Sequence, residues 1–274
     1  MPIEWSETPD ARLSIAGAGL EYACWGPEPD KAPTLVMLHE GLGSVAQWRD
    51  LPAQLAAATG FGVLAYSRAG YGGSDLAPLP RPLDYQTREA IDVLGPVLDA
   101  ADIRSAILLG HSDGATIATI YAGSVSDMRV RGLVLIAPHF FTEAPGLAAI
   151  RAAGAAYRTG DLRARLAKYH TDVDVAFGGW HDVWTDPAFE SWNVADAIDH
   201  LRIPVLAIQG RRDPYGTLAQ ITEIEDRIYS PVETLILDDC GHAPQQEHPE
   251  PTKAAITAFC ARLDRLERQV VSVA

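Results

Sequence analysis

The stretch Gly110-His111-Ser112-Asp113-Gly114 decides how the rest of this sequence is interpreted. It follows the apolar run Ala106-Ile107-Leu108-Leu109 and precedes a run of small, helix-forming residues at 115–122. A strand, a five-residue turn with glycine at both ends and then a helix form the context of a nucleophile elbow. A serine on so sharp a turn sits in strained backbone, and its neighbours two positions away must be small for strand and helix to pack closely. The sequence therefore predicts that Ser112 projects its hydroxyl outward at the end of a buried strand.

Short apolar runs alternate with helical patterns on both sides of this stretch. We expect strands at residues 34–38, 62–66, 106–109, 132–137, 204–208 and 233–237, and helices at 48–59, 85–101, 115–122, 218–229 and 249–268. Strands that alternate with helices indicate βαβ units, and hence an α/β fold with a mostly parallel central sheet flanked by helices. Residues 11–25 are expected to form an opening antiparallel hairpin, and Pro96 to disturb the helix 85–101.

Polar residues stand where the apolar runs end. In a parallel sheet, ligands bind beyond the carboxyl ends of the strands. The residues that follow apolar runs in this way are His39, Arg68, Ser112, His139, Asp213 and His242. Their shared position carries more weight than any single motif, because it predicts one site at one edge of the sheet.

Three of these residues suit nucleophilic catalysis. A serine hydroxyl is a poor nucleophile until a base takes its proton, and a histidine base needs a carboxylate to hold its tautomer. Ser112, Asp213 and His242 follow one another along the chain in the order known for one group of hydrolases with a serine nucleophile.

Alternatives exist for two of the three residues. Asp238 or Asp239 could be the acid in place of Asp213, which we favour because it follows a buried strand and a glycine. His248 is a rival to His242, but it precedes a proline at a helix start and lacks the glycine turn. We expect His111, inside the pentapeptide, to point away from Ser112 and to be structural.

With these residues the chain resembles the α/β-hydrolase fold superfamily, from the His39-Glu40-Gly41 turn through the elbow to Gly241-His242. The likeness is to its single-domain serine esterases and carbon–carbon bond hydrolases. It implies that Ser112 is the nucleophile, Asp213 the acid and His242 the base, with no metal and no organic cofactor. It also implies an oxyanion hole formed by the backbone N–H groups of Asp113 and Gly41, with Leu42 as the alternative second donor.

Residues 140–197 differ from the rest of the chain. No strand pattern is visible there, helix formers dominate, and Trp180, Trp184 and Trp192 cluster. The resemblance implies that this segment is a helical lid, inserted between sheet strands of a core domain at residues 1–139 and 198–274. Residues expected to line the substrate pocket are Leu42, His139, Phe140, Trp180 and Trp184, although core packing is the ordinary fate of such tryptophans.

Glu40 stands where many members of the superfamily carry glycine. An unpaired anion beside the oxyanion hole would oppose the negative charge that develops in the transition state. We therefore predict an ion pair between Glu40 and Arg68, which follows the neighbouring strand. The alternative is a solvent-exposed Glu40.

Composition narrows the class of protein. The 274 residues include 36 acidic and 22 basic ones, and the net charge of −14 repels nucleic acid and anionic membrane surfaces. No apolar run approaches the roughly 20 residues that span a bilayer, and the N-terminus lacks the basic and apolar regions of a secretory signal. The three cysteines show no zinc or redox spacing. We expect a cytoplasmic enzyme with a small-molecule substrate and no nucleic-acid or membrane partner. Its oligomeric state stays open, with a homodimer as the common form.

These observations favour a serine hydrolase that cleaves a small, fairly apolar carboxylic ester or related acyl compound. The same triad serves carbon–carbon bond hydrolases of aromatic degradation, lactonases and thioesterases of the superfamily. An epoxide hydrolase or haloalkane dehalogenase would need a carboxylate at the position of Ser112, which argues against both. Two hypotheses assign the chain to other classes of protein. One is a ligand receptor on the same fold, and the other is a lyase or oxygenase that does not need the serine.

Overall fold

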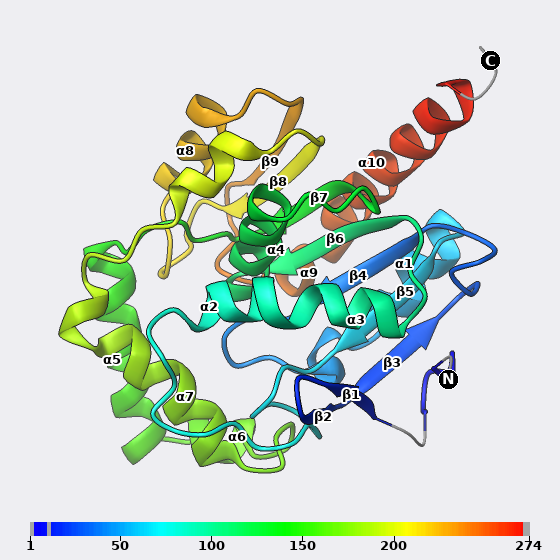
Figure 1. Ribbon diagram of the computed structural model, residues 1–274. Coiled ribbons are helices and arrows are strands. Elements are labelled where there is room, and N and C mark those ends of the chain that lie inside the picture. The colour runs from blue at the N-terminus through cyan, green and yellow to red at the C-terminus, as the bar shows by residue number, and fades with distance from the viewer. Residues whose placement is uncertain (1–2, 10–11, 271–274) are drawn as a thin grey trace.

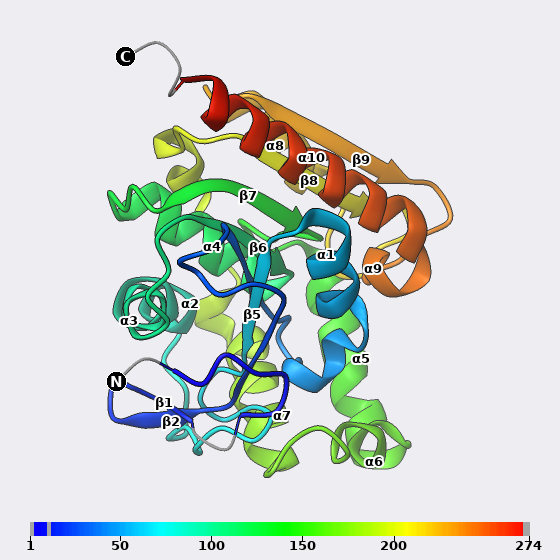
Figure 2. The same cartoon turned by 90° about the vertical axis from the view of Figure 1, so that its right-hand side faces the viewer.

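The computed structural model describes residues 3–9 and 12–270. Within them, seven strands form one sheet, and helices cover both of its faces (Figures 1 and 2). The order of strands across the sheet is β3 (Tyr22–Trp25), β5 (Gly62–Tyr66), β4 (Thr34–Leu38), β6 (Ala106–His111), β7 (Val130–Ile136), β8 (Val205–Gly210) and β9 (Val232–Leu237). Only β3 runs antiparallel to its neighbour. The prediction of a mostly parallel sheet flanked by helices is confirmed.

The strand register brings the polar strand ends together. Leu38 at the end of β4 pairs with Gly110 in β6, and His111 pairs with Ile136 at the end of β7. Every residue of β4, β5 and β6 is buried. This burial on both faces explains why these strands are continuous apolar runs in the sequence.

The predicted opening hairpin is present in part. β1 (Leu13–Ile15) pairs with β2 (Ala18–Leu20) as a separate two-stranded sheet. Its two turn residues, Ala16 and Gly17, have φ of 51° and 82°, as a tight hairpin turn requires. Of the predicted range 11–25, residue 11 lies outside the described residues, and the last four residues form β3 of the large sheet instead.

Two layers of helices sandwich the sheet. One face is covered by η1 (Val45–Trp48), α1 (Leu51–Thr59), α9 (Pro244–Glu247) and α10 (Pro249–Val270) (Figure 2). The other is covered by α4 (Asp113–Ser124), α8 (Ala219–Arg227), η4 (Ala195–His200) and the predicted helix 85–101. In the described part of the chain, no helix combines the length and the apolar character needed to cross a membrane.

The predicted helix 85–101 consists of three consecutive helical parts, and Pro96 is the second residue of the third part. These are α2 (Tyr85–Arg88), the π-helical η2 (Glu89–Leu94) and α3 (Gly95–Ala100). A proline has no N–H to donate, and in a regular α-helix its ring clashes with the carbonyl four residues earlier. The wider turns of a π-helix ahead of Pro96 relieve that conflict.

The chain between β7 and β8 forms helices and, among the described residues, no strand. We call α5 (Ala144–Thr159), α6 (Leu162–Leu166), α7 (Val173–Thr185) and η3 (Pro187–Phe189) the inserted helices. They lie beyond the carboxyl ends of the parallel strands (Figure 1). They have an apolar cluster of their own, which includes Leu147, Phe177 and Trp184.

The crossing of β6, α4 and β4 leaves no room for a side chain at either glycine of the elbow. A Cβ on Gly114 would clash with the backbone carbonyl of Leu38, and one on Gly110 would clash with the backbone of Gly114. The prediction that the residues two positions from Ser112 must be small is therefore explained by steric contacts in the fold.

We expect Gly114→Ala to lower the free energy of unfolding by about 1–3 kcal/mol or more, because the backbone of β4 would have to move. Gly178→Ala in α7 is the matched control. Its Cβ would meet no heavy atom closer than 3.6 Å, so the replacement should stabilise the helix by about 0.5–1 kcal/mol. Urea unfolding of both variants measures the difference. Equal stability of the two would contradict this account of the elbow.

Candidate active site

Ser112 occupies the strained position that the sequence predicts. It lies between the last residue of β6 and the first residue of α4, with φ of 53° and ψ of −118°. Its N–H donates to the carbonyl of Ile136 at 2.8 Å, which holds the turn against β7. A left-handed conformation at a residue with a side chain is costly and persists where the surrounding structure demands it. The side chain opens onto a cavity of about 120 Å³.

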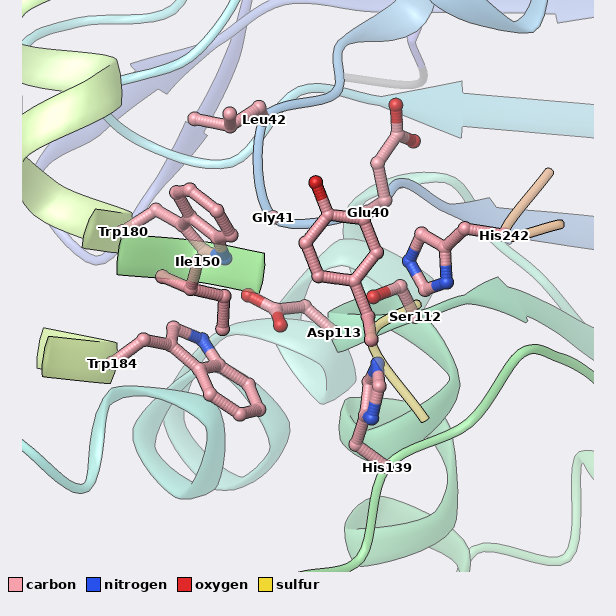
Figure 3. A pocket seen from close by; sticks show the side chains of 11 residues that line it. Glu40, Gly41, Leu42, Ser112, Asp113, His139, Ile150, Trp180, Trp184 and His242 are labelled. Atoms are coloured by element: carbon pink, nitrogen blue, oxygen red, sulfur yellow. The ribbon is translucent and has the colours of Figure 1, made fainter. Parts of the chain in front are cut away.

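His242 and Asp213 meet beside this serine. His242 follows β9 and Asp213 follows β8. His242 Nδ1 lies 2.7 Å from Asp213 Oδ2, and the imidazole ring lies next to Ser112 in the cavity wall (Figure 3). The Asp213 carboxylate is fully buried and also accepts hydrogen bonds from Gln209 Nε2 at 2.9 Å and from the N–H of Tyr215 at 2.8 Å.

These contacts fix the charge of Asp213. Burial alone would raise its pKa, but the hydrogen bond and charge of His242 and the N–H of Tyr215 outweigh burial and lower the pKa. An ionised Asp213 holds a proton on Nδ1 of His242, so Nε2 is the ring nitrogen that can accept another. The Ser112 hydroxyl makes no hydrogen bond to any described residue, and such contacts commonly tighten only when substrate binds.

The alternative acid and base residues lie elsewhere. Asp238 and Asp239 are exposed and pair with Arg211 and Arg212, at 2.8 Å and 2.5 Å. His248 Nε2 lies 3.2 Å from the carbonyl of Asp239. The structure does not bring these side chains to the cavity that Ser112 lines.

The turn after β4 is held by Arg68, a buried residue. Its Nη1 donates to the carbonyl of His39 at 2.6 Å and its Nη2 to the carbonyl of Glu40 at 2.9 Å. His39 Nε2 accepts from the N–H of Arg68 at 3.0 Å, so its Nδ1 carries the proton and donates to the Glu40 carbonyl at 2.7 Å. Because a peptide is planar and trans, the N–H of Gly41 points away from this carbonyl.

The predicted oxyanion donors are unused by the fold. Among the described residues, no acceptor lies within hydrogen-bond distance of the N–H of Gly41 or of Leu42. Asp113 is the first residue of α4, and the N–H groups of a first helical turn have no partner within their helix. Gly41 and Asp113 both line the same cavity as Ser112.

The predicted ion pair between Glu40 and Arg68 is wrong. The guanidinium of Arg68 is occupied by two backbone carbonyls, and the carboxylate of Glu40 instead lies 3.4 Å from His111 Nδ1. Glu40 is 21% exposed at its side chain, so it is not the solvent-exposed residue of the alternative either. His111 does not line the cavity that Ser112 lines, and its Nε2 donates to the carbonyl of His242 at 2.7 Å.

Four of the five predicted pocket residues line the cavity: Leu42, His139, Trp180 and Trp184. Phe140 does not. Its side chain is fully buried in the core between the sheet and α4, whereas that of the preceding His139 lines the cavity. Its N–H donates to Gln220 Oε1. Burial, reinforced by the charge of His242, lowers the pKa of His139 to about 3, so this pocket residue is neutral.

Sequence reasoning missed two lining residues, Ile150 and Tyr215. Tyr215 comes two residues after Asp213, and its ring lies 4.8 Å from that of His242. Ile150 lies three residues after Leu147 on α5, and this helical spacing of apolar residues was the available signal. The sequence also gave no sign that the carboxyl groups of Glu40 and Asp113 reach the cavity wall.

The inserted helices complete the cavity. Ile150, Trp180 and Trp184 face Ser112 from α5 and α7 (Figure 3). A Cβ on Gly41 would clash with Cδ1 and Nε1 of Trp180, so this indole edge rests on Gly41. Among the described residues, no group of three or more His, Cys, Asp or Glu side chains is placed to hold a metal ion.

Comparison with known proteins places these features in a family. The model of the alpha/beta hydrolase family matches residues 35–255. Epoxide hydrolase 3 of Xenopus tropicalis is 22% identical, over 90% of this chain and 76% of its own length. An enol-lactonase from Burkholderia xenovorans LB400 superposes with a TM-score of 0.69 at 21% identity, over 91% of this chain and 99% of its own. A thermophilic esterase from Thermogutta terrifontis has a TM-score of 0.73 at 17% identity, over 92% and 98%.

The contact between Glu40 and His111 predicts a pH-dependent stability. Burial alone would raise the pKa of Glu40 and lower that of His111. Their hydrogen bond and charges outweigh burial, so the pKa of Glu40 falls below 4.5 and that of His111 rises above 6.5. The lowered pKa of Glu40 stabilises the fold above pH 4.5, and this stabilisation is lost as pH falls through the pKa of Glu40 in the folded state. The raised pKa of His111 stabilises the fold below pH 6.5, and this stabilisation is lost as pH rises through the pKa of His111 in the folded state.

We therefore expect Glu40→Gln to cost most stability between pH 4.5 and 6.5, and progressively less as pH rises beyond that window. Urea unfolding of wild type and variant across this range measures the difference. Asp238→Asn, which removes an exposed carboxylate, is the control and should show no such window. A constant difference between Glu40→Gln and wild type at every pH would rule out the coupling.

Proposed function

Because the chain belongs to the alpha/beta hydrolase family, we propose that it is a serine hydrolase that cleaves a small, fairly apolar carboxylic ester or related acyl compound. One observation carries the proposal. Three strand ends far apart in sequence contribute to it: two place a strained serine and a histidine in one cavity, and the third holds a fully buried carboxylate to which the histidine is hydrogen-bonded at 2.7 Å. This is the constellation that activates a serine hydroxyl.

In the proposed reaction, Ser112 Oγ attacks the carbonyl carbon while His242 Nε2 takes its proton. The tetrahedral intermediate collapses to an acyl-enzyme as His242 returns the proton to the leaving alkoxide. A water molecule, deprotonated by His242, then releases the acid and restores Ser112. Asp213 stays ionised throughout, holding the imidazole orientation and stabilising the imidazolium. No step calls for a metal or an organic cofactor.

The oxyanion is proposed to bind the N–H groups of Gly41 and Asp113, with that of Leu42 as the alternative to Gly41. Arg68 and His39 support this role as positioning residues, because their hydrogen bonds to the Glu40 carbonyl orient the next peptide. The pairing of Glu40 with His111 supports it as well, since a paired carboxylate opposes the developing charge less than a lone one.

Residues 140–197 are proposed to act as a lid over a core domain made of residues 1–139 and 198–274. The inserted helices supply an isoleucine and two tryptophans to the cavity. A cavity of about 120 Å³ with such walls suits a short, largely apolar substrate. Thioesters share the acyl chemistry of the ester. A lactonase and a carbon–carbon bond hydrolase with the same triad are the alternatives to the ester hydrolase.

The named epoxide hydrolase relative makes epoxide opening the second candidate. Epoxide hydrolases of this superfamily need a carboxylate at the elbow position, and in this chain a serine, Ser112, occupies that position. Asp113 is one residue further on, and its carboxylate is hydrogen-bonded by Tyr85 and Gln86 of α2. These contacts favour the ester hydrolase over the epoxide hydrolase.

We expect a fluorophosphonate probe to label the wild type once and to leave Ser112→Ala unlabelled, because only an activated serine reacts. Turnover of a short p-nitrophenyl ester should be lost in the same variant. Ser124→Ala, at the far end of the same helix, is the control and should keep both. Intact-mass measurement reads out the label. A folded wild type that takes no label would favour a receptor, or a lyase or oxygenase that does not need the serine.

Gly41→Ala should lower kcat for the ester by about 10²–10³-fold, because its Cβ displaces Trp180 and disturbs a proposed oxyanion donor. KM should change less, because the lost contact belongs to the transition state. Gly178→Ala, on the same helix as Trp180, should retain wild-type kinetics. An unchanged kcat in Gly41→Ala would remove Gly41 from the oxyanion hole.

A further inference from the structure

We propose that the Asp113 carboxylate is a polar anchor in the substrate cavity and selects short acyl groups that end in a hydrogen-bond donor, a hydroxyl or an ammonium. The inference rests on the proposed function, because it takes Ser112 as the nucleophile. It goes further by assigning a chemical feature to the acyl part of the substrate.

The position of Asp113 is the first support. Its side chain is 1% exposed and lines the cavity. In Figure 3 the carboxylate lies on the side of Ser112 opposite His242, toward Ile150, Trp180 and Trp184. An acyl chain attached to Ser112 and directed away from His242 would therefore run toward Asp113.

The walls around the carboxylate are the second support. Leu42, Ile150 and the two tryptophans are apolar, and no lysine or arginine of the described residues lines this cavity. In an apolar pocket, the few polar groups present fix the orientation of the ligand and determine specificity. Asp113 is one of these polar groups and the one beside Ile150, Trp180 and Trp184; it accepts hydrogen bonds, so it favours a donor on the ligand there.

The hydrogen bonds of the carboxylate leave it capacity for a ligand. Tyr85 Oη donates to Oδ2, and Gln86 Nε2 donates to Oδ1 at 3.2 Å. Trp184 Nε1 in turn donates to Tyr85 Oη at 3.0 Å, which ties this network to the inserted helices. An ionised carboxylate can accept about four hydrogen bonds, and the described residues supply two.

The charge of the Asp113 carboxylate is the reason why a hydrogen-bond donor, and not an alkyl group, is favoured at the end of the acyl group. Asp113 follows the nucleophile directly, so its carboxylate lies near the oxyanion. Burial raises its pKa, and the charges of Arg68 and Arg81 with the Tyr85 hydrogen bond counter this only in part. An alkyl group would cover the carboxylate without a hydrogen bond, whereas a hydroxyl or an ammonium would supply one and offset its charge.

The test uses three p-nitrophenyl esters that differ only at the end of the acyl chain: butanoate with a methyl, β-hydroxypropanoate with a hydroxyl, and β-alanine with an ammonium. We expect wild type to prefer at least one donor-bearing ester to butanoate by about tenfold or more in kcat/KM. A preference for β-alanine over β-hydroxypropanoate would assign a cationic acyl group, and the reverse a neutral one.

Asp113→Leu should abolish this preference, and Asp113→Asn should weaken it more for the ammonium than for the hydroxyl. The asparagine variant has nearly the native shape and keeps the test decisive should the leucine variant not fold. Tyr85→Phe is the matched control, because it disturbs the same network but leaves the carboxylate in the cavity. It should keep the preference for the donor-bearing ester.

Two outcomes overturn the anchor. Wild type could hydrolyse butanoate as well as the other two esters, or the Asp113 variants could slow all three esters equally, as expected if the carboxylate only ties α2 to α4. Either result would leave the proposed serine hydrolase intact, provided that Ser112 is labelled and butanoate is turned over. Absent labelling together with no turnover of any ester would instead overturn the proposed function, and the anchor with it.

Discussion

The left-handed backbone of Ser112 is the constraint on which the rest of the site depends. Strand β6 must end and α4 must begin within a single residue, and the two glycines around the serine are the sites where these elements touch each other and β4. The resulting geometry lifts the hydroxyl above the sheet and aims the first N–H groups of α4 at the same space. An atom placed there meets the serine hydroxyl and the positive end of the helix together.

Around this point the fold balances buried charge in several ways. The guanidinium of Arg68 donates its hydrogen bonds to two backbone carbonyls of the turn after β4, and its charge also favours the ionised form of Asp113. Glu40 is paired with His111, Asp213 with His242, and Asp113 is held by neutral donors from α2. Each carboxylate near the site therefore has a different partner. Low-dielectric surroundings make an unpartnered one costly and make each pairing effective.

Much of this was determined by the sequence alone. Six of the seven sheet strands were predictable to within about two residues at each end, because they are apolar runs bounded by turn residues, whereas β3 was expected in the opening hairpin. The elbow was predictable because the close approach of strand and helix leaves room only for glycine on either side of the serine. Asp213 and His242 were singled out because each follows an apolar run, and the parallel pairing of β8 and β9 then brings the strand ends together. These signals lie in short stretches of sequence, because burial and backbone strain restrict which residue types can occur there.

Only the tertiary structure decided which side chains meet. The partner of Glu40 is His111, 71 positions along the chain, and not Arg68. Phe140 turns into the core while His139 faces the cavity, and Ile150 and Tyr215 reach the cavity from separate elements. Asp113, whose backbone N–H is a predicted oxyanion donor, also has its carboxylate in the cavity wall. Such outcomes depend on how helices far apart in sequence pack against the sheet and on which way each side chain points, and neither is encoded in the local pattern of residues.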